Sequence, residues 1–179
     1  MFHEPGLGLE ADWQANIFRI LKQHDVKHIV YVPDAGHATA IRLAVADKEI
    51  HSVVLTTEEE GIGYLAGAWL GGERGALLMQ SSGVGNCINT LALQACARFP
   101  LLMLVTMRGD WAEFNAWQNP MGQAAEQSLR LMGVMTWWAD KPDEVESLLH
   151  GAATMAFNGD SACALLLGQR LIGEKKWVK

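Results

Sequence analysis

The sequence of 179 residues has little positive charge, few cysteines and no long apolar run. Its 14 lysine and arginine residues stand against 20 acidic residues, which leaves a formal net charge of −6. This charge argues against nucleic-acid binding, because that function needs a basic surface to neutralise phosphates. No apolar stretch approaches the ~20 residues that cross a bilayer, and no basic segment followed by an apolar run opens the chain. We therefore expect a cytoplasmic protein that binds neither nucleic acid nor membrane.

Cysteine is the second scarce component. Cys87, Cys96 and Cys163 are odd in number, and no two of them have the spacing of metal ligands. Free thiols in a reducing compartment are the simplest interpretation. The sequence therefore predicts neither a disulfide bond nor a metal site in this chain.

Apolar residues are plentiful, at 50% of the sequence, while charged residues make up only 19%. This composition supports a hydrophobic core and argues against disorder. The length corresponds to one domain by the usual size relation. We predict a single domain over residues 1–179, with a core from about residue 10 to about residue 172.

Short, uninterrupted apolar runs alternate along the chain with segments of helical spacing. Runs without polar alternation are typical of strands that are covered on both faces of a parallel sheet. They lie at residues 28–32, 52–55, 76–79, 101–106, 133–138 and 162–167. Helical segments lie at 12–23, 58–70, 84–97, 126–132 and 142–157. This order predicts an α/β fold, a doubly wound domain with about six mostly parallel strands and helices on both faces.

The connections that follow the strands form the candidate site, because ligands of such sheets bind beyond the carboxyl ends of the strands. These connections are residues 33–37, 56–60, 80–86 and 107–123. The last one is the longest, and it mixes polar with aromatic residues. That composition is typical of a binding loop or a lid.

Three consecutive acids, residues 58–60, stand at the start of a predicted helix that is rich in glycine and alanine. On their own, such acids are explained by their favourable interaction with the helix dipole. Each glycine, however, costs a helix about 0.5–1 kcal/mol relative to alanine. A helix with so few large side chains indicates close approach of another backbone or a ligand.

The segment QSSGVGN at residues 80–86 also follows a predicted strand and opens a helix. Its backbone N–H groups could cradle a phosphate. It lacks the lysine of a P-loop and does not fit the dinucleotide fingerprint. Tight-turn geometry and ligand approach therefore remain equal alternatives for this segment.

The stretch TTEEEGIGYLAGAWLGG, followed by ALLMQSSGVGN, resembles the pyrimidine-binding domain of thiamine-diphosphate enzymes. In that family a strand ends in an essential glutamate, with alanine seven residues later and an aromatic residue ten residues later. Counting from Glu59 reaches Ala66 and Trp69, whereas counting from either neighbouring acid does not reach this pair. The resemblance therefore implies that Glu59 is the glutamate that activates the cofactor.

The sequence further resembles the sulfopyruvate and phosphonopyruvate decarboxylase group. The likeness extends over roughly residues 10–172 and rests on VPD at 32–34, EEEG at 58–61, MQSSGVGN at 79–86 and MRGDW with QNPMGQ within 107–123. Full-length members also carry a GDG…N segment that binds Mg²⁺ and the diphosphate, and this sequence has no GDG. The resemblance therefore implies the α subunit of a split enzyme. A β subunit would bind the diphosphate and Mg²⁺, in an assembly of two α and two β subunits or larger.

The implied activity is decarboxylation of a small anionic 2-oxo acid, most directly sulfopyruvate to sulfoacetaldehyde and CO₂. By resemblance, Glu59 hydrogen-bonds the aminopyrimidine of thiamine diphosphate. The other implied cofactor contacts are Ser82, Gly83, Val84, Gly85 and Asn86. The implied substrate contacts are Asp34, Ala35, His37, Arg108, Gln118 and Gln123, and His37 is also a candidate catalytic acid or base.

Several alternatives remain open at this point. His37 is also explained as a solvated or capping residue, and Arg108 as an ion-pair partner of Asp110 or Glu113. Phosphonopyruvate decarboxylation or another thiamine-dependent lyase or carboligase reaction is an alternative activity. A non-catalytic, flavodoxin-like binding or regulatory module is the alternative from another class.

Overall fold

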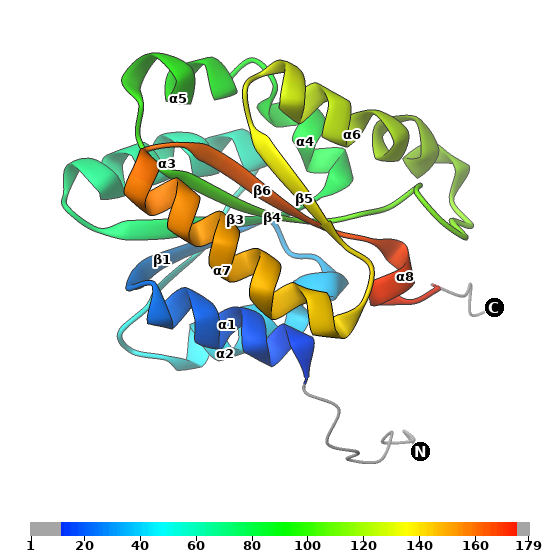
Figure 1. Cartoon of the computed structure of the whole chain (residues 1–179), viewed down its shortest axis with the longest axis horizontal. Coiled ribbons are helices and arrows are strands. Elements are labelled where there is room, and N and C mark those ends of the chain that lie inside the picture. Colours follow the sequence, from blue (N-terminus) through cyan, green and yellow to red (C-terminus); the bar gives the residue numbers. More distant parts are fainter. Residues whose placement is uncertain (1–11, 175–179) are drawn as a thin grey trace.

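The computed structural model describes residues 12–174, which form a parallel six-stranded sheet with helices on both faces (Figure 1). The strand order is β2-β1-β3-β4-β6-β5, and all neighbouring strands run parallel. The strands are β1 (Val26–Tyr31), β2 (His51–Val54), β3 (Arg74–Gln80), β4 (Leu101–Thr106), β5 (Met135–Ala139) and β6 (Ala162–Leu167). This confirms the predicted α/β fold. The predicted domain also includes residues 1–11 and 175–179, which lie outside the described residues.

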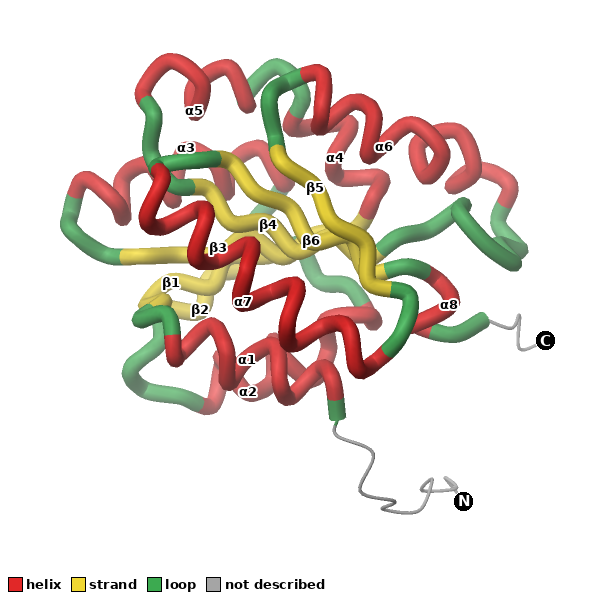
Figure 2. Tube along the Cα trace, viewed as in Figure 1, coloured by secondary structure: helices red, strands yellow, loops and turns green. Residues whose placement is uncertain are grey.

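Two layers of helices cover the sheet (Figure 2). One layer contains α1 (Trp13–Gln23), α2 (Ala38–Ala46) and α7 (Pro142–Gly159). The other contains α3 (Glu58–Leu70), α4 (Ser81–Cys87), α5 (Leu91–Ala97) and α6 (Asn119–Leu131). The short elements are η1 (Ala35–His37), η2 (Ala116–Gln118) and α8 (Gln169–Ile172).

The central strands β4 and β6 explain the continuous apolar runs of the sequence. Every residue of both strands is buried. Successive side chains of a strand point to opposite faces, so Leu102 and Leu104 pack in the core under α1, α2 and α7. Leu101 and Met103 pack in the core under α3 to α6. A strand with a core on each face has no position for an exposed polar side chain.

The structure corrects three helix predictions. Residues 84–97 are not one helix, because α4 starts at Ser81 and α5 is a separate helix. Helix α6 starts at Asn119, inside the predicted loop 107–123, so the predicted helix 126–132 was too short. Helix α2 was not predicted at all. Its buried residues are Ala40 and Ala44, which give a much weaker helical pattern than a stripe of large apolar residues.

The three cysteines are free thiols, as predicted, with Cys87 and Cys163 buried and Cys96 exposed. Burial raises the pKa of the Cys87 thiol to about 12 and that of Cys163 to about 11. Within residues 12–174 no helix has the length and apolar character needed to span a membrane.

Candidate functional site

Three connections of the predicted site meet where strands β1, β3 and β4 end, because these strands are direct neighbours in the sheet. The carboxyl ends of the strands lie on the right-hand side of Figure 1, next to α8. Asp34 follows β1, Gln80 ends β3 and Thr106 ends β4. Hydrogen bonds between their side chains join the three segments.

Asp34 is the centre of this hydrogen-bond network. Its carboxylate accepts hydrogen bonds from Gly36 N at 2.8 Å, Gln80 Nε2 at 3.0 Å and Thr106 Oγ1 at 2.8 Å. Burial alone would raise the pKa of Asp34, but these hydrogen bonds outweigh it and hold the pKa below its ordinary value. Ser82 Oγ extends the network by donating to Gln80 Oε1 at 2.9 Å. Asp34 is therefore an ionised residue that joins the ends of three strands.

A hollow of about 370 Å³ lies beside Asp34 and includes the exposed residue Ala35. It is lined by Pro33, Asp34, Ala35, Ala38, Ile41 and Arg42. Arg42 is exposed and brings a positive charge to this hollow. Arg42 is not among the residues predicted from the sequence, because helix α2 was not predicted. Arg42 follows Ala35 by seven residues, about two turns of a helix, so a predicted helix here would have placed both residues on the same side.

His37 lies inside the protein and has no exposed surface. Its Nε2 is 3.2 Å from both Met79 O and Leu104 O. Both neighbours are carbonyl oxygens, so Nε2 carries the proton and donates it. Burial lowers the pKa of His37 despite the nearby Asp34, so the ring is neutral near pH 7. The prediction of His37 as an acid, a base or a substrate contact finds no support in this geometry, since the ring links strands β3 and β4.

Arg108 is the second predicted residue that the structure places differently. Its guanidinium binds Glu113 through two parallel contacts, Nε to Oε2 and Nη2 to Oε1. Only 2% of the Glu113 side chain is exposed. The hydrogen bond from Arg108 lowers the pKa of Glu113 to about 2. The structure thus shows the ion pair with Glu113 that was the alternative role of Arg108, and the charge of Arg108 is neutralised within the loop.

The two predicted glutamines lie around helix α6. Gln123 Nε2 donates to Gly109 O at 2.6 Å, which fixes the loop after β4 to the helix. Gln118 borders a hollow of about 610 Å³. The other residues that line this hollow are Ser82, Ala116, Trp117, Pro120 and Met121. The structure therefore brings Gln118 next to the predicted cofactor contact Ser82, whereas Gln123 has a bracing role.

The three adjacent acids have three different environments. Glu58 is buried and accepts a hydrogen bond from Asn86 Nδ2 at 2.8 Å. A Cβ atom on Gly83 would overlap the Glu58 side chain, so only glycine leaves room for it. Glu60 accepts a hydrogen bond from Thr56 N at 2.8 Å and closes the first turn of α3. Glu59 is exposed, and its nearest partner is Thr90 Oγ1 at 3.5 Å.

Several small residues are exposed on the same helix as Glu59 and on the neighbouring helix α4. Helix α3 continues from Glu59 with the exposed residues Gly63 and Gly67. Of the predicted cofactor contacts, Ser82, Gly85 and Asn86 are exposed, whereas Gly83 and Val84 are buried. A Cβ atom added to Gly63 or Gly67 would meet no atom within 4 Å, and Glu59 and Asn86 add exposed polar side chains. The small and polar exposed residues are compatible with the pyrimidine of thiamine diphosphate, whereas Gly83 and Val84 are buried.

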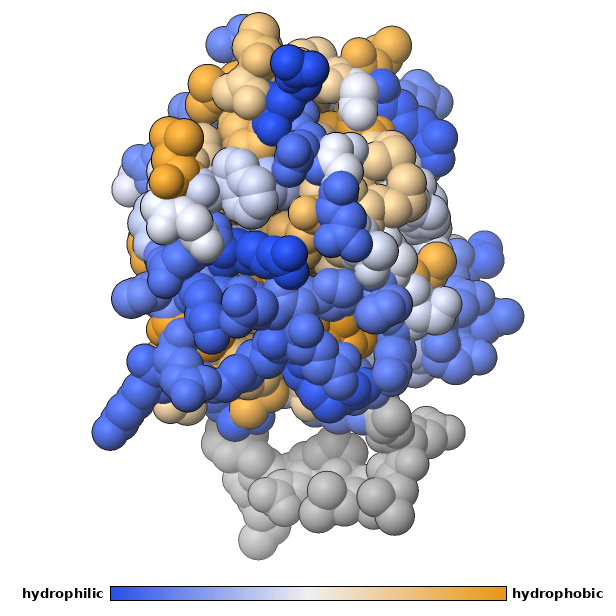
Figure 3. Space-filling model, turned by 60° about the vertical axis from the view of Figure 1, so that its left-hand side comes forward, coloured by the Kyte–Doolittle hydropathy of each residue, from blue (hydrophilic) through white to orange (hydrophobic). Residues whose placement is uncertain are grey.

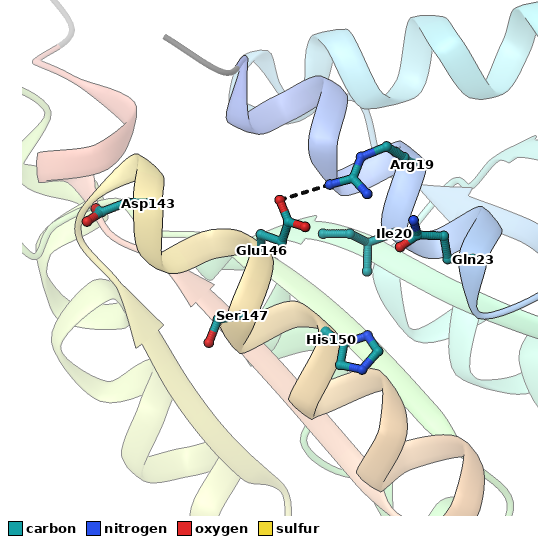
Figure 4. A pocket seen from close by; sticks show the side chains of 7 residues that line it. All are labelled: Arg19, Ile20, Gln23, Asp143, Glu146, Ser147 and His150. Carbon is teal, nitrogen blue, oxygen red and sulfur yellow. Dashed lines mark ion pairs between the residues drawn. The ribbon is translucent and has the colours of Figure 1, made fainter.

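Another hollow, of about 540 Å³, lies between α1 and α7 on the opposite face of the sheet (Figure 4). Arg19 of α1 and Glu146 of α7 point toward one another there and form an ion pair of 2.8 Å. Both side chains are well exposed, at 44% and 57%. None of the predicted site residues lines this hollow.

Comparisons with known proteins agree with the fold and with the predicted family. The model of the family described as "Thiamine pyrophosphate enzyme, N-terminal TPP binding domain" matches residues 12–127. The sulfopyruvate decarboxylase subunit alpha of Methanococcus maripaludis is 35% identical over 152 residues, which are 84% of this chain and 91% of the relative. The corresponding subunit of Methanocaldococcus jannaschii is 35% identical over 151 residues, 84% of this chain and 89% of the relative.

A solved structure shows the same fold. It is a 2-oxoglutarate:ferredoxin oxidoreductase from Magnetococcus marinus, which superposes with a TM-score of 0.72 at 12% sequence identity. The match covers 92% of this chain but only 33% of the oxidoreductase chain. At this identity the likeness concerns the fold alone.

Proposed function

The chain belongs to the thiamine pyrophosphate enzymes, and from this we propose that it is the α subunit of a thiamine-diphosphate-dependent decarboxylase of sulfopyruvate. The proposal rests most directly on Glu59, which is exposed at the start of α3 on the same helix as the exposed glycines Gly63 and Gly67. The similar relatives are named as alpha subunits, which supports a second kind of subunit in the active complex. In the proposed complex, that β subunit binds the diphosphate and Mg²⁺.

Thiamine diphosphate, when bound, supplies the electron sink that decarboxylation of a 2-oxo acid requires. The role of this chain is to bind and orient the pyrimidine and to hold a proton at Glu59. A partner subunit that covers Glu59 would remove water from the carboxyl group and favour its protonated form. Glu59 can then share a proton with a ring nitrogen at neutral pH. The buried Glu58 supports this arrangement, because its carboxylate accepts a hydrogen bond from Asn86.

The proposed substrate site is the hollow beside Ala35. An anionic substrate in a protein of net charge −6 needs a local positive group. Arg42 lines this hollow, whereas Arg108 is already bound to Glu113. We therefore assign the anion contact to Arg42 rather than to Arg108. A planar guanidinium suits a carboxylate or a sulfonate, and phosphonopyruvate is the alternative substrate because phosphonopyruvate decarboxylases are also relatives.

The test is a turnover assay on the reconstituted complex. The chain is co-expressed with a candidate β subunit that carries the GDG…N segment, and CO₂ release is measured with thiamine diphosphate and Mg²⁺. The proposal predicts turnover of sulfopyruvate in preference to phosphonopyruvate by the complex, and none by either subunit alone. A stable complex that decarboxylates neither acid would overturn it.

A variant assay tests the assignment of the anion contact. Arg42→Ala should raise KM for sulfopyruvate about tenfold, which corresponds to about 1.4 kcal/mol of lost binding. Arg19→Ala, which removes an exposed arginine of the other hollow, is the matched control and should keep the KM of the parent complex. An unchanged KM in Arg42→Ala would remove Arg42 from the site.

A further inference from the structure

A second group of titratable side chains lies at the amino ends of the strands, opposite to the candidate site. His28 belongs to β1, His51 is the first residue of β2 and Glu73 directly precedes β3. Each residue offers a ligand atom, and these atoms lie within 4.8 Å of one another. Among the described residues, this is the group of histidine, cysteine and acidic side chains with the spacing of a metal site.

The sheet itself brings the two histidines together. In the parallel register of β1 and β2, His28 is the direct neighbour of His51. Their rings stack with centroids 4.8 Å apart and an angle of 20° between the planes. Glu73 completes the group, because its Oε2 lies 2.6 Å from His28 Nε2.

A fourth residue, Tyr64 of α3, orients the ring of His28. Its hydroxyl lies 3.0 Å from His28 Nδ1. If Nε2 binds a cation, Nδ1 carries the ring proton and donates it to the tyrosine oxygen. Histidines that bind metals usually have such a partner on the second nitrogen, which fixes the tautomer and the direction of the ring.

We propose that His28, His51 and Glu73 bind one divalent transition-metal ion of the Zn²⁺ type. Two imidazoles and one carboxylate are ligands that this class of ion prefers. His28 is only 8% exposed, whereas His51 and Glu73 are exposed. The ion would therefore have a rigid ligand on its protein-facing side and room for water molecules on its solvent-facing side. No metal site was predicted from the sequence, because the three ligands come from separate segments.

The ion would stabilise the edge of the sheet. Strand β2 is an edge strand whose neighbour in the sheet is β1. The ligands join β2 to β1 and to the turn between α3 and β3. The same turn ends helix α3, which carries Glu59 at its other end. The site is thus structural and separate from the proposed chemistry.

The test is a metal titration of the full chain after removal of metals with EDTA. Zn²⁺ binding is measured by calorimetry, and Co²⁺ binding by visible absorption, which reports ligand geometry. We expect one ion per chain. His51→Ala removes an exposed ligand without disturbing the core and should weaken binding at least ~100-fold. Tyr64→Phe leaves all three ligands in place but removes the partner of His28 Nδ1, and should weaken binding about tenfold.

The matched control is His150→Ala. His150 lies 3.0 Å from His24 in a histidine pair in the opposite helical layer, so this variant tests whether any two histidines suffice. It should bind Zn²⁺ like the parent chain. Zn²⁺ should also raise the melting temperature of the parent chain but not that of His51→Ala. Equal binding by His51→Ala, loss of binding in His150→Ala, or no binding of one equivalent by the parent chain would each overturn the proposal.

Discussion

The two helical layers on either side of the sheet differ in the surface that they present. In the layer of α1, α2 and α7, an ion pair between Arg19 and Glu146 spans the hollow between two helices. In the layer of α3 to α6, Leu70 and Leu131 are 88% and 87% exposed, and Trp117 beside α6 is 85% exposed. Figure 3 shows the same contrast, with orange and tan atoms concentrated in the upper part and mainly blue atoms in the lower part, toward α1 and α2.

Helix α3 illustrates the exposed surface of the layer of α3 to α6. Its buried side packs against the sheet through Ile62 and Leu65, and its exposed side carries Glu59, Gly63 and Gly67. A surface helix normally has charged and polar residues on its exposed side. Exposed apolar residues beside small ones are typical of a surface that another chain covers. We therefore propose that the β subunit binds on the layer of α3 to α6.

The largest effect is expected from Glu59→Gln. This change keeps the size of the side chain but removes the carboxyl group that shares a proton with the cofactor. Turnover of the reconstituted complex should fall at least ~100-fold, in the range of lost acid–base catalysis, while assembly is retained. Glu60→Gln is the matched control in the same triplet and should retain most of the activity, because Glu60 only caps α3. Near-normal turnover by Glu59→Gln would place the essential carboxyl elsewhere.

Matched substitutions at two glycines, one in each layer, compare the two layers directly. Gly63 on α3 and Gly151 on α7 are both exposed, and an added Cβ would meet no atom within 4 Å at either position. Gly63→Leu should weaken binding of the β subunit at least ~100-fold, because a bulky side chain clashes in a packed interface. Gly151→Leu should leave binding unchanged. Calorimetric titration of the two variants with the β subunit measures this, and equal affinities would contradict the assignment of the binding layer.

Gly83→Ala tests the packing beneath the exposed surface. The added methyl group would overlap the buried Glu58 side chain. Overpacking of this kind costs about 1–3 kcal/mol. Urea unfolding should therefore show a loss of stability in this range. Gly67→Ala has open space at the same atom and should instead gain about 0.5–1 kcal/mol from helix propensity. Equal effects of the two changes would show that Glu58 moves aside without cost.

The smallest expected difference is between the stability contributions of two ion pairs, Arg108–Glu113 after β4 and Arg19–Glu146 between α1 and α7. Glu113→Gln should cost about 1.5–3 kcal/mol at pH 7, because it breaks a shielded hydrogen-bonded charge pair with Arg108. Glu146→Gln removes the exposed partner of Arg19 and should cost less than about 1 kcal/mol. Urea unfolding at pH 7 measures both values.

The acid dependence of stability distinguishes these ion pairs further. The folded-state pKa of Glu113, about 2, lies below its ordinary value of 4.5. Its stabilisation is therefore complete above about pH 4.5 and is lost as the pH falls toward about 2. Stability should decrease less steeply over this range in Glu113→Gln than in the parent chain. An identical pH profile of the two proteins would argue against the contribution of Glu113.

Much of the fold could be predicted from the sequence, and so could the region of the site. Strands β4 and β6 form continuous apolar runs because both of their faces are buried. The acidic triplet was correctly placed at the first residues of α3. Helix α2 was missed because alanine, which fills its buried positions, is also common outside helices. The roles of His37 and Arg108 were harder to predict, since each depends on how a single side chain is surrounded.

The sequence by itself determined the order of the strands, several of the helices and the position of Glu59 at the start of α3, because apolar pattern and motif spacing are local properties of the chain. Only the tertiary structure decided which polar side chains are left for a ligand. Glu58 is held by Asn86, and His37 by carbonyl groups of β3 and β4, through contacts between segments that are distant in sequence. Glu59 remains exposed because α3 packs on the sheet through its other side.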